Sequence, residues 1–243
     1  MPPPLLSVVI PALNEEERVA TAVHSVRDDA EVIVVDGGSA DGTRAAAEAA
    51  GATVIASARG RGVQLATGAR AARGEWLVFL HADTRLEEGW AAALRSLPPE
   101  KVGGAFRFAL DAPGVAYRLL EAGVGLRCLL FRLPYGDQGL FARRAAYETI
   151  GGFRPMSLME DVDFVRRLGR AGPLALLPVR AWTSARRFER RGAAATSLRN
   201  LGLLTLYAAG CAPDRLARLY GARADASAAR LTGPDAPGTN TFG

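Results

Sequence analysis

The chain has little lysine, histidine or cysteine and no long apolar run, and each shortage argues against a class of protein. Lys101 is the only lysine among 30 basic residues, and the chain holds 2 histidines and 2 cysteines. Cys128 and Cys211 are far apart in sequence, which argues against a disulfide scaffold or a cysteine-ligated metal site, so we expect reduced thiols. No apolar run reaches the roughly 18 residues of a membrane span.

Several sequence signals are also absent. No Gly-x-Gly-x-x-Gly follows the first predicted strand, and no P-loop lysine exists, which excludes the usual dinucleotide and P-loop sites. No basic stretch is interleaved with aromatic residues, which argues against nucleic-acid binding. Residues 1–4 lack the charged and apolar regions of a signal peptide, so we expect a cytoplasmic location. The net charge of +5 comes from scattered arginines, which suit an anionic substrate such as a nucleotide diphosphate.

Short apolar runs alternate with helical periodicity through the first 110 residues. Pro11 is expected to end the first strand, and Asn14 to cap the next helix with Glu17 as its capping-box partner. This alternation predicts an α/β fold with a mostly parallel sheet and right-handed crossovers. Buried strands are predicted over residues 6–10, 31–36, 53–56 and 76–80.

The second half is less regular. The apolar pattern predicts strands over 102–110, 139–142, 174–177 and 179–186, and helices over 90–97, 113–130, 194–209 and 214–220. From residue 222 onward large apolar side chains are almost absent, which predicts a disordered tail. We therefore expect one domain over residues 1–221, with a nucleotide-binding half (1–110), an acceptor half with C-terminal helices (111–221) and a tail (222–243).

Polar side chains follow the predicted parallel strands where those strands end. Asp36 follows one strand, and His81 and Asp83 follow the buried run 76–80. Ligands of open α/β sheets bind at this edge. Asp36 suits a base or ribose hydroxyl because an ionised carboxylate only accepts hydrogen bonds, while Asp83 suits Mg²⁺ or Mn²⁺ shared with two phosphates. Arg61, between two glycines, can reach a diphosphate. Taken alone, Asp83 fits an Asp-initiated turn equally well.

Six segments of the sequence carry motifs: residues 7–16, 34–43, 74–84, 135–141, 151–153 and 159–161. In combination, they resemble the successive motifs of the family 2 glycosyltransferases of the GT-A fold, and the resemblance covers roughly residues 6–190. The variants His-Ala-Asp at 81–83 and Gly-Asp-Gln at 136–138 are similar to those of a bacterial subgroup of small, stand-alone transferases associated with radical-SAM and selenium-related gene neighbourhoods.

The resemblance implies a metal-dependent, inverting glycosyltransferase that uses a nucleotide-diphosphate sugar, in the first place a UDP-sugar, and an unknown hydroxyl acceptor. It makes Pro11, Glu15 and Asp36 contacts of the nucleoside. Asp83 matches the last acid of the family's Asp-x-Asp metal motif, and the implied cofactor is Mn²⁺ or Mg²⁺. His81 stands where that motif has its first acid, so the chain departs from the family pattern there.

The resemblance also assigns roles on the acceptor side. Asp161 matches the general base of the Glu-Asp motif, with Glu160 beside it, and Asp137 and Gln138 become acceptor or sugar contacts. The residues alone leave a second interpretation open for each pair. Glu160 and Asp161 also fit the first turn of a helix, where negative charge is favourable, and Asp137 and Gln138 also fit a turn.

Two other functions remain open from the sequence. A sugar nucleotidyltransferase would share the fold, but it would carry a glycine-rich basic loop after the first strand, where residues 11–16 are acidic. A non-catalytic binding module for nucleotide sugars is favoured by His81. The basic run 186–191 and the leucines after it predict either a helix on the inner face of a membrane or a helix that covers the core or a homodimer interface, and the second is favoured.

Overall fold

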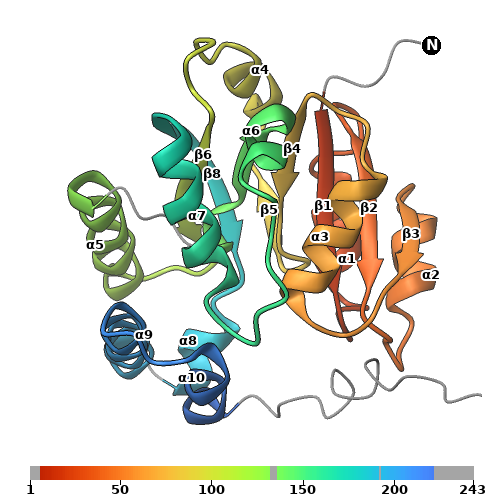
Figure 1. The fold of residues 1–243 in the computed structure, drawn as a ribbon. Coiled ribbons are helices and arrows are strands. Elements are labelled where there is room, and N and C mark those ends of the chain that lie inside the picture. Colours follow the sequence, from red (N-terminus) through yellow and green to blue (C-terminus); the bar gives the residue numbers. More distant parts are fainter. Residues whose placement is uncertain (1–5, 132–135, 192, 222–243) are drawn as a thin grey trace, which may run out of the picture.

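The computed structural model describes residues 6–131, 136–191 and 193–221, and within these ranges eight strands form one sheet (Figure 1). The strand order is β3-β2-β1-β4-β7-β6-β8-β5. Strands β3, β2, β1 and β4 run parallel, β7 lies antiparallel to both of its neighbours, and β8 is parallel to β6. The strands are β1 (Leu6–Ala12), β2 (Glu31–Asp36), β3 (Thr53–Ala56), β4 (Trp76–Phe79), β5 (Thr84–Leu86), β6 (Gly103–Leu110), β7 (Leu140–Arg143) and β8 (Leu174–Thr183). The predicted α/β fold with a mostly parallel sheet is confirmed.

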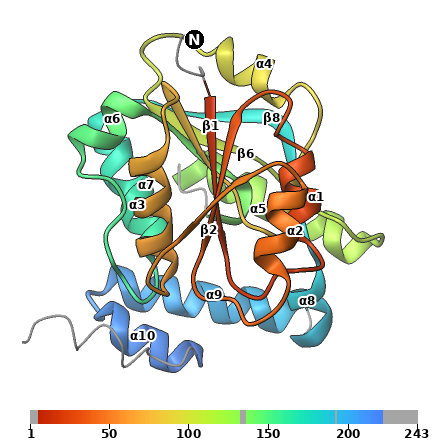
Figure 2. The same ribbon diagram turned by 90° about the vertical axis from the view of Figure 1, so that its right-hand side faces the viewer.

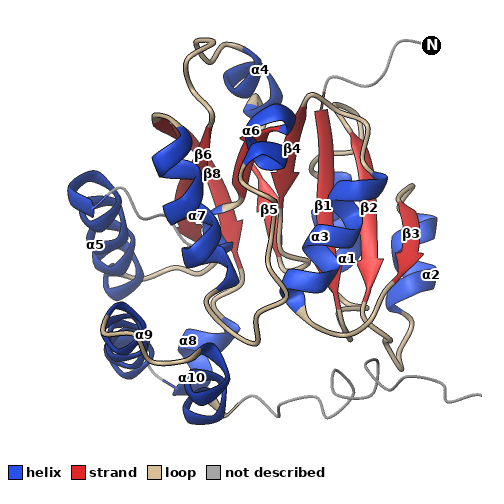
Figure 3. Ribbon diagram, viewed as in Figure 1, coloured by secondary structure: helices blue, strands red, loops and turns tan. Residues whose placement is uncertain are grey.

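Helices cover both faces of this sheet (Figure 3). The described helices are α1 (Val19–His24), α2 (Thr43–Ala49), α3 (Arg61–Ala71), α4 (Trp90–Arg95), α5 (Val115–Phe131), α6 (Arg144–Thr149), α7 (Glu160–Ala171), α8 (Arg186–Arg191), α9 (Ala193–Ala208), α10 (Pro213–Tyr220) and the 3-10 turn Gly136–Gln138.

The alternation of side chains along β1 explains the two layers. Val8 and Ile10 point to one face and pack with α1, α2 and α4, whereas Val9 points to the other face and packs with α3, α6 and α7. Figure 2 shows these two groups of helices on opposite sides of the strands. A third, smaller cluster joins Phe108 and Leu110 at the end of β6 to α5 and α8.

The first strand is longer than predicted, because Pro11 does not end it. Pro11 pairs with Val35 of β2, and β1 continues to Ala12. On its other side, β1 pairs with β4 only as far as Val9. The missing N–H of Pro11 therefore falls where β1 has a neighbour on one side only, the position in which a sheet tolerates proline.

The predicted capping box at Asn14 and Glu17 is also wrong. Helix α1 begins at Val19, with Arg18 as its N-cap. Asn14 adopts a positive φ of 54°, and its side-chain oxygen accepts a hydrogen bond from the backbone N–H of Ala40 at 2.9 Å. Asparagine tolerates this left-handed conformation, so the segment forms a loop bonded to the loop after β2 instead of a helical turn.

Three further elements differ from the sequence prediction. The two closing strands are one strand, β8, which accommodates Pro178 through a register shift between Phe106 and Arg107 of the facing strand. Residues 184–186 lie beyond its end, and α8 begins at Arg186. The three-residue strand β5 and the six-residue helix α6 were not predicted. The predicted disorder of residues 222–243 lies outside the described residues.

The close approach of β6 to β8 gives a test of the fold. A Cβ atom added to Gly104 would lie 1.8 Å from the backbone oxygen of Ala175, so Gly104→Ala forces two paired strands apart. We expect the free energy of unfolding in urea to fall by about 1–3 kcal/mol or more. Gly123→Ala on α5 is the control, because nothing lies within 4 Å of its added Cβ atom. That variant should gain up to about 1 kcal/mol from helix propensity. Equal effects of the two substitutions would contradict the tight packing of β6 on β8.

Candidate active site

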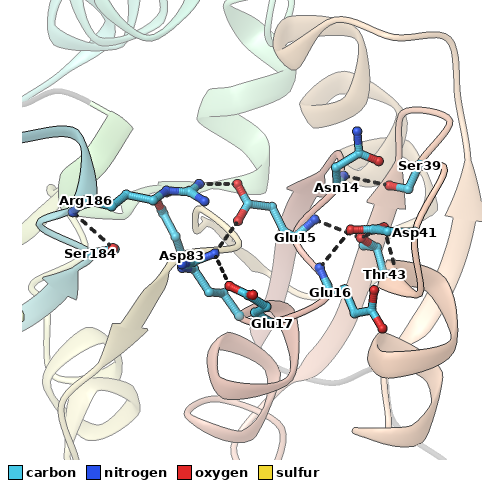
Figure 4. A network of polar contacts seen from close by, with 11 residues as sticks. Asn14, Glu15, Glu16, Glu17, Ser39, Asp41, Thr43, Asp83, Ser184 and Arg186 are labelled. Carbon is cyan, nitrogen blue, oxygen red and sulfur yellow. Dashed lines mark hydrogen bonds and ion pairs between the residues drawn. The ribbon is translucent and has the colours of Figure 1, made fainter. Parts of the chain in front are cut away.

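The carboxyl ends of β1, β2 and β4 meet at one edge of the sheet, as the sequence predicted, and their loops are bonded to each other. The loop after β1 donates from the backbone N–H of Glu15 to Thr43 Oγ1 at 2.8 Å and from that of Asn14 to Ser39 Oγ at 3.0 Å (Figure 4). Gln64 of α3 ties the strand ends together, because its side-chain amide donates to the carbonyl oxygens of Ala12 and Val35.

Asp36 is fixed by the turn that follows its strand. Its carboxylate is 2% exposed and accepts hydrogen bonds from the backbone N–H of Ser39 at 3.1 Å and from that of Gly38 at 3.3 Å. The hydroxyl of Ser39 donates to the same carboxylate. Pro11, at the end of the neighbouring strand, is half-buried. Two of the three residues predicted to contact a nucleoside, Pro11 and Asp36, therefore lie on adjacent strand ends, with Asp36 held by the turn.

A first charged cluster joins Glu15, Asp83 and Arg186. One guanidinium nitrogen of Arg186 is bonded to Glu15 and lies 3.4 Å from Asp83 Oδ2 (Figure 4). Partial burial opposes the charge of Arg186, but the carboxylates of Glu15 and Asp83 outweigh it and raise the pKa of Arg186. A single cation thus bridges the ends of β1 and β4.

Arg186 was not predicted as a site residue. The sequence pattern put residue 186 at the end of a strand, whereas the side chain comes from the first turn of α8, more than 100 residues after Asp83. The only signal in the sequence was a basic residue at the end of the last predicted strand, and that signal is common to many surface arginines.

A second cluster surrounds Arg61 on α3. Its Nε donates to Glu160, while its Nη1 lies 3.4 Å from His81 Nε2 and its Nη2 lies 3.8 Å from Asp161 Oδ2. The backbone N–H of Gly136 donates to the same Asp161 oxygen at 2.8 Å. A small cavity opens between these groups, lined by Arg61, Leu65, Phe79, His81, Gly136, Leu140, Phe153 and Asp161.

Burial sets the electrostatics of this second cluster. Glu160 is 2% exposed, and burial raises the pKa of its carboxyl, while the Arg61 guanidinium opposes that rise. For Arg61 desolvation favours the neutral form, but the carboxylates of Glu160 and Asp161 outweigh it and raise the pKa of the guanidinium. Arg61 is therefore a permanent cation that holds two adjacent carboxylates together.

Asp137 and Gln138, the two residues predicted as acceptor contacts, have different surroundings. Asp137 lies near enough to Arg61 to help raise the pKa of that guanidinium. Gln138 is 1% exposed, and its amide is bonded to the protein interior: Nε2 donates to the carbonyl of Phe106 at 3.3 Å and Oε1 accepts from Cys128 Sγ at 3.2 Å. The side chain of Gln138 thus fixes the turn that carries Gly136 and does not face the cavity.

The two predicted metal ligands, Asp83 and His81, belong to different clusters. Among the described residues, no three histidine, cysteine or acidic side chains gather closely enough to hold an ion by themselves. Asp83 offers one carboxylate, 12% exposed, beside the Arg186 cation, and His81 faces Arg61. Mg²⁺ and Mn²⁺ sites often use one or two carboxylates together with substrate phosphates and waters. The residues therefore fit a cation that arrives with a diphosphate.

The first part of the chain is similar to known glycosyltransferases. Residues 7–96 match the family model described as glycosyl transferase family 2. A 63-residue segment is 44% identical to glycosyltransferase AglJ of Haloferax volcanii and covers 25% of this chain and 21% of that protein. A 92-residue segment is 35% identical to the glucosyl-3-phosphoglycerate synthase of Mycolicibacterium paratuberculosis and covers 32% of this chain and 28% of that protein. The chain thus spans less than a third of the length of either relative.

A solved structure extends the likeness to most of the chain. The glucosyl-3-phosphoglycerate synthase of Mycobacterium tuberculosis, crystallised with Mn²⁺, uridine diphosphate and phosphoglyceric acid, is 25% identical with a TM-score of 0.50. The match covers 71% of this chain and 68% of that chain. The sheet and its flanking helices therefore have the GT-A fold.

The pair formed by Arg61 and Glu160 leads to a pH-dependent prediction. In Arg61→Met the buried carboxylate of Glu160 loses its cation, and the free energy of unfolding at neutral pH should fall by up to about 3 kcal/mol. This is the lower end of the range for buried pairs, because the Arg61 side chain is 36% exposed. Loss of the cation raises the pKa of Glu160 further, so the folded state binds the proton more tightly than the unfolded chain. The deficit should therefore shrink as the pH falls toward the ordinary carboxyl value of 4.5.

The double variant Arg61→Met with Glu160→Gln is the control. The neutral amide needs no cation, so this variant should regain most of the lost stability at neutral pH and lose the pH dependence. Urea unfolding at several pH values measures both effects. A deficit that is constant with pH and is not rescued by Glu160→Gln would show that the ion pair is not its cause.

Proposed function

We propose that this chain belongs to glycosyl transferase family 2 and transfers a sugar from a nucleotide-diphosphate donor to a hydroxyl group of an acceptor. The observation that carries the proposal is the turn 81–83 after β4, which joins the two charged clusters. Asp83 belongs to the cluster with Glu15 and Arg186, and His81 to the cluster with Arg61 and Asp161. The cluster proposed to bind the diphosphate and the cluster that holds the proposed base therefore meet at this turn.

The nucleoside half of the donor would bind at the ends of β1 and β2. Asp36, whose carboxylate is fixed by Ser39, would accept hydrogen bonds from a base or ribose, with Pro11 on the neighbouring strand end and Glu15 in the loop that follows it. A uridine diphosphate sugar is the favoured donor, which is supported by the similar synthase crystallised with uridine diphosphate. A panel of nucleotide sugars, scored by mass spectrometry for hydrolysis and transfer, tests both the reaction and the donor.

The diphosphate would be neutralised by the cations that the two clusters supply. Arg186 now bridges Glu15 and Asp83, and a bound diphosphate, with one negative charge on each phosphate of a nucleotide sugar, offers it alternative partners for charge-assisted hydrogen bonds. Asp83, released from Arg186, would then hold Mn²⁺ or Mg²⁺ together with phosphate oxygens. When bound, such a cation offsets the negative charge that develops on the leaving diphosphate. His81 stands beside Arg61 at the border of this site.

Asp161 is the proposed general base. In a direct displacement, the acceptor oxygen forms its bond to the anomeric carbon while the bond from that carbon to the diphosphate breaks, and the hydroxyl proton passes to Asp161. Attack from the face opposite the diphosphate inverts the anomeric centre. The N–H of Gly136 and the nearby Arg61 hold one Asp161 oxygen in place, and Glu160 positions Arg61. Asp137 is the proposed acceptor contact, and Gln138 supports its turn.

The role of Asp161 separates an enzyme from a module that only binds nucleotide sugars. Asp161→Asn keeps the shape of the side chain but cannot take up a proton. Turnover should fall by on the order of 10²–10⁴-fold, with little change in donor affinity. The control is Asp163→Asn in the same helical turn, because Asp163 is bonded to Arg167 and Arg154 and plays no proposed part in the reaction. Near-normal turnover by Asp161→Asn would refute the assignment.

Arg186 and the cation compete for Asp83, which gives a second test. Arg186→Met should strengthen the binding of Mn²⁺ alone, because Asp83 and Glu15 lose their bound guanidinium. The same change should weaken the binding of uridine diphosphate without metal by about tenfold or more, the usual value of a charge-assisted hydrogen bond. Titration calorimetry measures both affinities.

Arg180→Met is the matched control. Arg180 lies on β8, the strand that leads to α8, and is paired with Glu87, so its substitution should change neither affinity. Chelation by EDTA should abolish transfer by the unchanged protein. Full transfer in EDTA, or parallel changes in the two affinities of Arg186→Met, would contradict the proposed exchange of partners.

A further inference from the structure

Two neighbouring helices in the second half of the protein expose large apolar side chains. Helices α5 and α9 are in contact and lie at the edge of the molecule beyond β6 and β8 (Figure 1). We call their outward residues the α5/α9 face. Its members are 44–76% exposed: Val115, Leu119 and Leu126 on α5, and Leu198, Leu201 and Leu206 on α9. Contiguous exposed leucines on a surface mark an interaction site more often than isolated ones do.

The α5/α9 face is not needed to complete the core. The inner side of α5 already packs against Phe108 and Leu110 through Tyr117, Leu120 and Val124. The outer side carries a stripe at helical spacing that contains no charge: Val115, Leu119, Ala122 and Leu126. On α9, the exposed positions within residues 195–208 are likewise uncharged: Ala195, Leu198, Leu201, Gly202, Thr205, Leu206 and Ala208.

The net positive charge of the protein comes from the stretch of sequence that includes α9 and α10. Residues 186–220 contain seven arginines and two acidic residues, a net charge of +5 that equals the charge of the whole chain. The other residues therefore hold 23 basic and 23 acidic side chains and are neutral together. Helix α10, which contacts α9, exposes Arg215 and Arg218 next to the exposed Leu219. An apolar face flanked by arginines is complementary to a partner with a negatively charged surface and an apolar layer directly beneath it.

We propose that the α5/α9 face docks on the anionic surface of a lipid bilayer. The leucines would enter the boundary between headgroups and acyl chains, and the exposed Arg215 and Arg218 of α10 would attract the anionic headgroups. The helices have 17 and 16 residues, shorter than the roughly 20 that cross a bilayer. No helix in the described part of the chain is long and apolar enough to cross a membrane. The helices would therefore lie in the plane of the interface.

The position of the face relates docking to the candidate site. Cys128 of α5 is bonded to Gln138 in the turn that carries Gly136, and α8, which bears Arg186, precedes α9. Docking would therefore place the acceptor side of the site close to the lipid headgroups. If the proposed function is correct, the acceptor hydroxyl belongs to a molecule at the membrane surface.

Sedimentation with lipid vesicles tests the docking without any nucleotide sugar. The full chain should sediment with vesicles of phosphatidylcholine mixed with phosphatidylglycerol, bind weakly to phosphatidylcholine alone, and dissociate at high salt. Leu198→Glu combined with Leu201→Glu should reduce binding to the anionic vesicles by on the order of 10- to 100-fold, the value of burying one or two leucines.

Leu176→Glu is the matched control. Leu176 is 47% exposed and lies near the start of β8, at the opposite end of that strand from α8, so this variant should bind vesicles like the unchanged protein. Circular dichroism establishes that all variants are folded. Donor hydrolysis measured without vesicles should be the same for all of them, so a failure of docking and a failure of the proposed function are told apart.

Two results would overturn the proposal. One is the absence of binding to anionic vesicles, or equal binding by the double variant and the unchanged protein. The other is a dimer in light scattering that the double variant dissociates while no form binds vesicles, which would assign the α5/α9 face to a second copy of the chain.

Discussion

The parallel pairing of β1 with β2 on one side and β4 on the other is the constraint on which the site depends. This register brings Ala12 opposite Asp36 and Val9 opposite Phe79, so three strands deliver their following loops to one edge. At the last residues of this ladder, the side-chain amide of Gln64 donates to the carbonyls of Ala12 and Val35. These two bonds tie α3 to the strand ends, and Arg61 lies at the start of the same helix.

The site places charged groups where burial is costly and balances them in pairs. Glu160 is almost fully buried and Asp161 follows it directly, which would leave two carboxylates in mutual repulsion without Arg61. Arg186 fulfils the same role for Glu15 and Asp83. Such pairs contribute little net stability compared with apolar packing, since desolvation offsets most of the Coulomb attraction. Their value lies in presenting cations and acids at fixed positions around a cavity.

The sequence was a good guide where local pattern decides the structure and a poor one where distant contacts decide it. The apolar runs located β1 to β4, and the residues at their ends, Asp36 and Asp83, do lie at one edge. Asn14 was misjudged because its side chain bonds to a loop 26 residues away instead of capping its own helix. Arg186 was missed because its partners, Glu15 and Asp83, lie 171 and 103 residues earlier in the chain. The inward orientation of Gln138 likewise depends on Phe106 and Cys128, which no local pattern reveals.

His81 illustrates how one substitution in a motif is explained by its surroundings. Its imidazole lies beside Arg61, within the cluster that already holds Glu160 and Asp161. An acid at this position, as the family motif has, would add a third carboxylate next to a single guanidinium in a largely buried site. A histidine can share the space with Arg61 without adding a third negative charge. Asp83 is left as the only carboxylate of residues 81–83, and it is paired with Arg186.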